Sequence, residues 1–370
     1  MGTGSTSEDK SELLHFEMLH FSIEFASNYY LYFLVFVAIP FGFFYRARIV
    51  SGLADNSFLS KRCTDQLRGL FIVIVVLHHI SERMISPGFL VLFRAPLGYF
   101  AVGIFLFLSG LGLTKSLKND QYLDKFLLKK IVRVYTPLVI VNMLTIVSLV
   151  LKGDDFSIAQ VLFFLLSVKF IDNSSWFIII ILLFYFLFWL SSVVAKDEKF
   201  ILMLTFLVSA YIVLSKIIGL GGWWYYSSLC FPMGVMCASY EKKVSDLIAI
   251  NYKGISVLSL VLFSLSFFLS RKFGFYNMLF VTCCLFSAST VIVLYGIDIH
   301  SAVFARIGRM SLEIYLVHMK VLFFFAYWGY FESPATIVVY FMFLILMSSY
   351  FYKFNNFIYN KVFPTTKAIS

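Results

Sequence analysis

Eleven apolar stretches, each long enough to cross the roughly 30 Å hydrocarbon core of a bilayer, constrain this chain more than any other feature. Because 61% of the residues are hydrophobic and only 14% are charged, a soluble fold has no interior large enough for them. The sequence therefore predicts an all-α polytopic membrane protein with about 10 to 11 transmembrane helices in one bundle. The predicted spans are residues 28–45, 69–87, 97–114, 134–151, 176–195, 200–218, 223–240, 254–270, 277–295, 311–330 and 335–352.

One further apolar run, 158–171, has only 14 residues and is predicted to be an interfacial or re-entrant helix. The spans divide the chain into an external N-terminal tail, an additional first helix, one large membrane domain and a cytoplasmic C-terminal tail. These four segments are residues 1–27, 28–45, 60–352 and 353–370.

The distribution of lysine and arginine predicts the orientation. With the N-terminus outside, the cytoplasmic segments hold 21 of the 30 cationic residues, as the positive-inside rule requires. If 158–171 crossed the membrane, every later segment would change sides and this excess would be lost. The net charge of +10 is therefore read as cytoplasmic anchoring in a plasma or inner membrane, with no nucleic-acid partner.

Several function classes lack their sequence signatures. The five cysteines have no metal-ligand spacing, and neither a zinc site nor a disulfide framework is predicted. There is no G-x-S-x-G, no H-E-x-x-H and no glycine-rich phosphate loop, which argues against a serine hydrolase, a zinc protease and an ATP-driven pump.

The strongest functional candidates are Arg68 and His79, which lie eleven positions apart in one predicted helix. At 100° per residue this spacing returns to the same helix face within about 20°, and the rise separates the two side chains by roughly 16 Å. Arg68 is predicted at the cytoplasmic face and His79 near the middle of the membrane. An ionisable residue at that depth indicates a functional site, although a histidine satisfied inside a bundle is the simpler alternative.

Two neighbours of His79 are secondary candidates. His78 points about 80° away from the Arg68–His79 face. Glu82, one turn further along, has the spacing to orient an imidazole, as a carboxylate does beside a histidine base. Glu82 also suits an external position among lipid headgroups.

The most basic segment, 115–133, includes Lys129, Lys130 and Arg133 at helical spacing. The three cations suit binding of anionic lipid or of a polyanionic donor from the cytoplasm.

Other polar residues in apolar surroundings are Ser109, Glu313, His318 and Lys320. Ser109 lies among glycines that suit close helix packing. The last three occur within eight residues of one helix, which predicts pairing among them or a polar cavity. The polar turn Asp172–Ser175 is predicted to be a loop. Three tryptophans are predicted to be interfacial belt residues, and these are Trp176, Trp223 and Trp224.

Six motifs follow one another along the chain: R-G-x9-H at 68–79, F-L-F-L-S-G at 105–110, K-K-I-V-R-V-Y-T-P at 129–137, S-W-F-I at 175–178, F-P-M-G at 231–234 and S-L-E-I-Y-L-V-H at 311–318. Their order resembles the membrane acyltransferase type 3 family, the O-acyltransferases of cell-surface polysaccharides. The family's arginine and histidine correspond to Arg68 and His79. Its Arg-Tyr-Pro segment corresponds to Arg133, Tyr135 and Pro137, here interrupted by Thr136.

The resemblance implies a membrane O-acetyltransferase that takes its acyl group from cytoplasmic acyl-CoA, usually acetyl-CoA, as donor co-substrate. Its acceptor is expected to be a hydroxyl of a cell-envelope glycan or glycolipid such as a capsular, exo- or lipopolysaccharide. His79 is then expected to act as the general base, Arg68 to position the donor or the histidine, and the basic loop to bind the CoA phosphates; no metal is expected. Two alternatives stay open: a membrane transporter or flippase, and a catalytically silent scaffold of envelope assembly.

Overall fold

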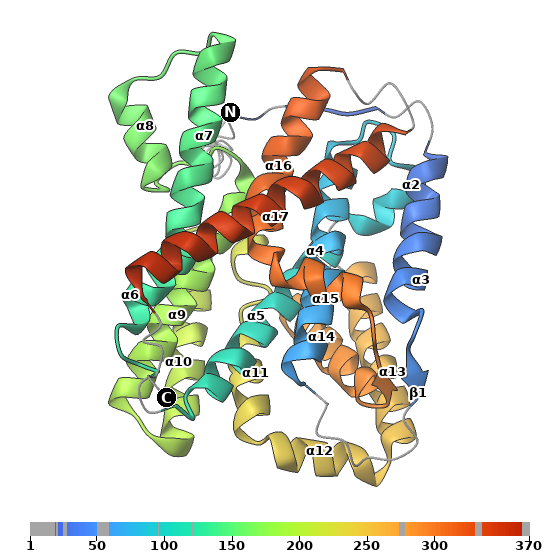
Figure 1. The fold of residues 1–370 in the computed structure, drawn as a ribbon. Coiled ribbons are helices and arrows are strands. Elements are labelled where there is room, and N and C mark those ends of the chain that lie inside the picture. The colour runs from blue at the N-terminus through green and yellow to red at the C-terminus, as the bar shows by residue number, and fades with distance from the viewer. Residues whose placement is uncertain are drawn as a thin grey trace, which may run out of the picture.

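The computed structural model describes residues 19, 21–24, 28–49, 59–94, 96–119, 122–273, 278–329 and 335–364. Nearly all of this part is helical (Figure 1). The one sheet within it pairs β1 (Arg48–Ile49) with β2 (Ile297–Asp298) in antiparallel register. The predicted all-α polytopic membrane fold is confirmed.

Seven helices of the described residues are long and apolar enough to cross a membrane. They are α4 (Lys61–Arg83), α5 (Leu97–Ser116), the run Phe126–Lys152, the run Asn173–Val194, α10 (Asp197–Ile217), α13 (Tyr252–Lys272) and α17 (Thr336–Val362). The run Phe126–Lys152 comprises α6 (Phe126–Lys130), the π-helix η3 (Ile131–Tyr135) and α7 (Thr136–Lys152). The run Asn173–Val194 comprises the 3₁₀ turn η4 (Asn173–Ser175) and α9 (Trp176–Val194).

Shorter or bent helices account for the four remaining predicted stretches. Helices α15 (Ala302–Arg309) and α16 (Ser311–Tyr327) meet at a bend of 77° and make an eighth span if they are counted together. The shorter apolar helices are α11 (Cys230–Ser239), α14 (Leu279–Tyr295) and the segment Tyr29–Phe44, which consists of α2 (Tyr29–Phe33), η1 (Leu34–Ala38) and α3 (Ile39–Phe44). Every one of the eleven predicted stretches thus contains an apolar helix.

Some predicted boundaries are wrong. The stretch 223–240 is not one helix, because η5 (Gly222–Trp224) and a turn precede α11. Pro232 explains the late start: in the first turn of α11 its missing N–H costs nothing, whereas deeper in a longer helix it would remove a hydrogen bond. Two segments between predicted spans also contain helices: α12 (Glu241–Ile250) lies within 241–253, and α15 lies within 296–310. Helix α17 continues to Val362, beyond the predicted end of its span at 352.

The short run at 158–171 forms α8 (Ile158–Leu165), which packs beside α7 at one end of the bundle (Figure 1). Eight residues rise only about 12 Å, so this helix cannot cross a bilayer. The predicted tail 1–27 lies mostly outside the described residues. Its described part is Leu19 and Phe21–Glu24, and Ile23 pairs with Arg83 at the end of α4 and with Ile85 just after it.

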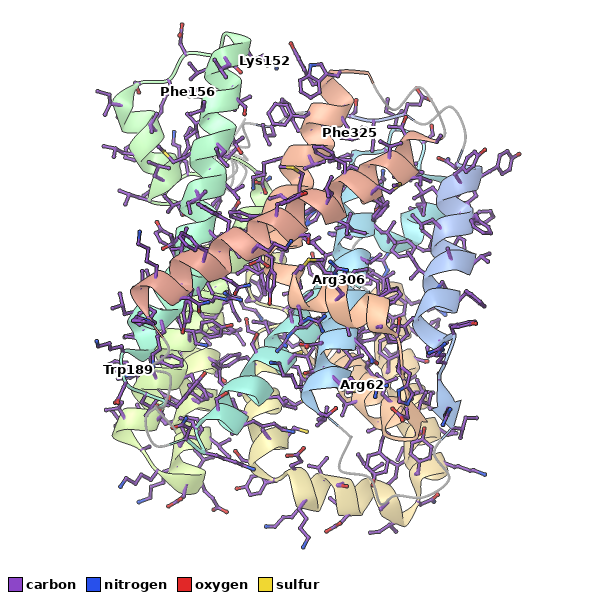
Figure 2. All side chains as sticks on the ribbon, in the orientation of Figure 1. Arg62, Lys152, Phe156, Trp189, Arg306 and Phe325 are labelled. Carbon is purple, nitrogen blue, oxygen red and sulfur yellow. The ribbon has the colours of Figure 1, made fainter. Side chains whose placement is uncertain are left out.

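Helices α4 and α5 form the centre of the bundle. In each, 61% of the most apolar 18-residue window is buried, against 17% in α13. The exposed faces of α10, α13 and α17 carry mainly large hydrophobic side chains (Figure 2). Such faces suit lipid and not water, as a membrane bundle requires.

Two pairs of glycines allow the central helices to touch their neighbours. A Cβ atom on Gly308 of α15 would lie 1.7 Å from the carbonyl oxygen of Asp65, and one on Gly69 would lie 2.0 Å from that of Phe304. Gly110 of α5 and Gly234 of α11 likewise each lie against a backbone carbonyl of the other helix. The glycine that follows Arg68 is therefore a packing residue, which brings α15 against α4.

Replacing Gly308 with alanine is expected to destabilise the protein by about 1–3 kcal/mol, because the new methyl group must push α15 away from the backbone of α4. Gly112→Ala is the matched control, since its Cβ would meet only the Arg68 side chain at 3.7 Å. Thermal unfolding in detergent measures both variants. Equal stability of the two would contradict the packing role.

Candidate functional site

One face of α4 lines two separate cavities. The residues on it recur every three or four positions, as one side of an α-helix does. Lys61, Asp65, Arg68 and Ile72 line the first cavity, of about 380 Å³. Val75, His78, His79 and Glu82 line the second, of about 390 Å³. We call the first the basic cavity and the second the histidine cavity.

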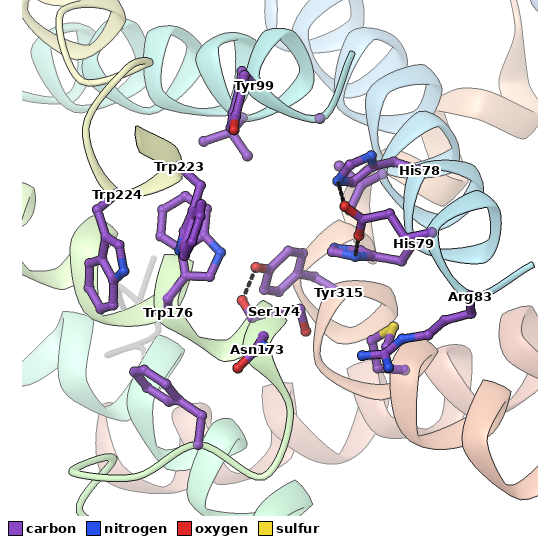
Figure 3. A pocket seen from close by; sticks show the side chains of 16 residues that line it. His78, His79, Arg83, Tyr99, Asn173, Ser174, Trp176, Trp223, Trp224 and Tyr315 are labelled. Atoms are coloured by element: carbon purple, nitrogen blue, oxygen red, sulfur yellow. Dashed lines mark hydrogen bonds and ion pairs between the residues drawn. The ribbon is translucent and has the colours of Figure 1, made fainter. Parts of the chain in front are cut away.

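The histidine cavity holds a carboxylate between two imidazoles (Figure 3). His79 Nδ1 lies 3.1 Å from one oxygen of Glu82, and His78 Nε2 lies 3.5 Å from the other. The Nδ1 atom of His78 lies 2.7 Å from the Phe93 carbonyl oxygen, to which it donates when protonated. A Cβ on Gly98 would approach His78 Nε2 to 2.6 Å, so this glycine makes room for the ring.

The ring of His79 contacts the ring of His318 of α16 in a tilted arrangement, with centroids 5.1 Å apart. When Nδ1 of His79 donates a hydrogen bond to Glu82, the Nε2 atom of His79 keeps a lone pair that can accept a proton. This is the tautomer that a general base needs.

Aromatic side chains form the opposite wall of this cavity. Figure 3 shows Trp176, Trp223 and Trp224 across the open space from the two histidines. The rings of Trp176 and Trp224 lie 5.8 Å apart, and Tyr99 lines the cavity from α5. The prediction of belt residues missed this grouping, because the turn before α11 brings Trp223 and Trp224 to the start of α9.

The basic cavity collects cations from four different elements. Five cationic and two acidic side chains line it: Lys61, Arg68, Lys130, Arg133, Arg309, Asp65 and Glu313. The excess of positive charge suits a polyanion. Lys61 and Arg309 did not stand out in the sequence, since only the fold brings them beside Arg68.

The side chains of the predicted basic cluster do not all reach this cavity. Lys130 lies over the rings of Tyr122, Phe126 and Tyr185, and Arg133 bonds to Asn356 of α17. Both line the cavity, whereas Lys129 is not among its lining residues, although helical spacing predicted one shared side. The π-helix η3 follows Lys130 and changes the register of the side chains around Arg133.

Arg68 lies in the basic cavity and not beside His79. Its guanidinium is 3.3 Å from Asp65 and donates to the Leu108 carbonyl oxygen at 3.4 Å. Ser109, on the next residue of α5, lines the same cavity. Of the two roles expected for Arg68, this position favours contact with a donor over contact with the histidine.

A buried ion pair lies beside the histidine cavity. Lys320 of α16 is paired with Asp172, and the side chains are 6% and 0% exposed. Asp172 also accepts from the backbone N–H of Ser174 at 3.0 Å and from the Ser175 hydroxyl at 3.3 Å. The predicted polar loop at 172–175 is a turn of the backbone, and the Asp172 carboxylate, which also accepts from the Ser174 hydroxyl, fixes this turn through four donors.

Three ionisable residues of the 311–330 span find partners outside their own helix. Glu313 accepts from Asn355 of α17 at 2.9 Å, Lys320 pairs with Asp172, and the ring of His318 contacts that of His79. The predicted pairing among them is wrong. Their side chains point to different neighbours because α16 packs against both α4 and α17.

His78, His79 and Glu82 present possible metal-ligand atoms within 4.8 Å of one another. The hydrogen bond between the Nδ1 atom of His79 and Glu82 accounts for that nitrogen and for one carboxylate oxygen without an ion. The absence of a functional metal stays a prediction.

A model of the acyltransferase type 3 family, which describes an acyltransferase domain, matches residues 62–353. No curated protein and no solved structure matches the chain. The matched region contains every residue that lines the two cavities except Lys61. The fold and the match define a multi-pass membrane protein of the acyltransferase class, and the chain belongs to the acyltransferase type 3 family.

Replacing Lys320 with methionine is expected to cost about 3–5 kcal/mol of stability, because it leaves the carboxylate of Asp172 buried without its cation. The double variant Lys320→Met/Asp172→Asn should regain most of this loss. Lys115→Met is the matched control: it breaks the half-exposed pair with Glu241 and should cost no more than about 1 kcal/mol. Thermal unfolding in detergent measures all three. A Lys320→Met variant as stable as Lys115→Met would contradict the role of the buried pair.

Proposed function

We propose that this protein is an O-acyltransferase that moves an acetyl group from cytoplasmic acetyl-CoA to a hydroxyl group of a cell-envelope glycan. The observation that carries the proposal is the pairing of His79 with Glu82 opposite an aromatic wall, while a basic cavity lies further along the same face of α4. The family match supports acyl transfer and gives no support to the transporter alternative.

The basic cavity is the proposed donor site. Acetyl-CoA carries phosphates, which guanidinium and ammonium groups bind through charge-assisted hydrogen bonds. Arg68, Lys130 and Arg133 supply such groups in one place. The excess of lysine and arginine at this end of the helices favours a cytoplasmic location, where acyl-CoA is available.

The histidine cavity is the proposed acceptor site. Nε2 of His79 takes the proton of the acceptor hydroxyl while the oxygen attacks the thioester carbonyl carbon. The tetrahedral intermediate then collapses: the C–S bond breaks, an ester forms, and the leaving thiolate of CoA receives the proton from His79. Glu82 stabilises the imidazolium that exists between the two proton transfers.

The acceptor is proposed to be a saccharide because of the tryptophan wall. Sugar rings have apolar C–H faces, which pack on aromatic rings, and polar edges, which suit the side chains of Asn173 and Tyr99 nearby. Transfer to an aliphatic alcohol but to no saccharide would contradict this part of the proposal. A plasma or inner membrane location follows from the same acceptor class.

His79→Ala is expected to lower the transfer rate by about 10²- to 10⁴-fold, because it removes the only proposed base. The assay measures transfer of labelled acetyl from acetyl-CoA to a saccharide acceptor by purified protein in detergent or proteoliposomes. The variant should still be stabilised by acetyl-CoA, since His79 does not line the basic cavity. Undiminished transfer by a folded His79→Ala protein would refute the base role.

The variant Lys130→Ala/Arg133→Ala is expected to bind acetyl-CoA roughly ten- to a hundred-fold more weakly, as the loss of charged hydrogen bonds predicts. Lys129→Ala is the matched control, because its side chain is on the same segment but does not line the cavity. The rise in unfolding temperature against acetyl-CoA concentration measures the affinity. Equal affinity in the double variant and the control would place the donor elsewhere.

A further inference from the structure

The basic and histidine cavities lie end to end between the same four elements. Helices α4, α5 and α16 and the segment 173–185 each contribute residues to both. On α5 the lining residues run from Tyr99 and Val102 in the histidine cavity to Phe105 and Ser109 in the basic cavity, at helical spacing. Because these four walls continue from one cavity into the other, the two cavities form two halves of one interrupted passage.

Tyr315 is the side chain that belongs to both halves. It lines each cavity, is only 7% exposed, and packs on Phe177 with ring centroids 5.4 Å apart. The ring of Phe177 in turn lies beside that of Phe105, with centroids 6.4 Å apart. These three rings form an aromatic partition between Arg68 on one side and His79 on the other, which helical rise separates by roughly 16 Å.

One hydrogen bond from the hydroxyl holds the Tyr315 ring in place, in addition to its ring contacts with Phe177 and His318. Its hydroxyl donates to the carbonyl oxygen of Ser174, as Figure 3 shows. That carbonyl cannot follow the ring, because Asp172 holds the turn through Ser174 and Ser175 and is itself paired with Lys320. The bond therefore joins a side chain that can rotate to an acceptor that is held in place.

We propose that Tyr315 is a gate: its ring closes the passage between the donor and acceptor cavities, and breaking its bond to Ser174 lets the acyl-bearing arm of the donor reach His79. The inference rests on the proposed function, because that function supplies the cargo. It adds a residue that determines whether the two sites communicate. A closed gate keeps the thioester away from water in the histidine cavity until the donor arm enters.

Accessibility tests the gate without any acyl transfer. Val102→Cys places a thiol in the histidine cavity, and a membrane-impermeant thiol reagent is added to vesicles on the side where Arg68 lies. Labelling of the protein's own five cysteines is subtracted with the parent protein. Adding Tyr315→Phe, which removes only the hydroxyl, is expected to raise the labelling rate roughly three- to ten-fold, the range for loss of one net hydrogen bond.

Turnover gives the second readout. Tyr315→Phe should raise acceptor-independent hydrolysis of acetyl-CoA by a similar factor, whereas the larger Tyr315→Trp should lower transfer by roughly ten-fold or more. Tyr252→Phe is the matched control: its hydroxyl also donates to a backbone carbonyl, that of Val293 at 2.7 Å, but lines neither cavity. If Tyr315→Trp fails to fold, Phe177→Leu, which thins the partition, should increase labelling as Tyr315→Phe does.

The outcomes separate the gate from the proposed function. Unchanged labelling and hydrolysis in folded Tyr315→Phe and Phe177→Leu proteins would overturn the gate, even if the wild-type protein transfers acetyl groups. Increased labelling in both, with no transfer from any acyl-CoA by the wild-type protein, would support the gate and contradict the proposed function.

Discussion

The period of the α-helix is the constraint on which both cavities depend. A face of α4 that repeats every three or four residues carries Arg68, Ile72, Val75 and His79 in a single line, so one helix connects cation and imidazole without any loop between them. The neighbours must come close enough to enclose that line. Gly69 and Gly308 allow α15 to do so, and Gly110 and Gly234 bring α11 against α5. Packing of small residues and a polar helix face are thus two aspects of one arrangement.

Much of this arrangement was predictable because it is local. The eleven-residue spacing of Arg68 and His79 determined their shared face, and the apolar stretches predicted every apolar helix. Glu82, one turn beyond His79, was predicted in the same way to be within reach of the imidazole, and it lies 3.1 Å from it. In each case the relevant distance follows from helix geometry and needs no knowledge of the partner helices.

The residues that the sequence did not reveal depend on contacts between segments far apart in the chain. Asp172 resembled an ordinary loop residue until α16 placed Lys320 against it, 148 positions later. Trp223 and Trp224 resembled interfacial anchors because their turn had no visible neighbour. Lys129 was grouped with Arg133 by its i,i+4 spacing, but the π-helix that begins at Ile131 lies between them and changes the register. Spacing predicts which face a residue occupies only while the helix stays regular.

The proposed separation of donor and acceptor into two cavities would also solve a chemical problem that a single open site creates. A thioester exposed to water beside a histidine base undergoes hydrolysis, and a wide aqueous path through the bundle would let ions leak. An aromatic partition with one hydrogen bond limits both, since opening requires loss of a single bond and not the movement of a helix. The cost of maintaining the partition is a buried charge, Asp172, which Lys320 and the 172–175 turn satisfy. The ion pair therefore has a use beyond stability: it keeps the acceptor of the Tyr315 hydrogen bond in place.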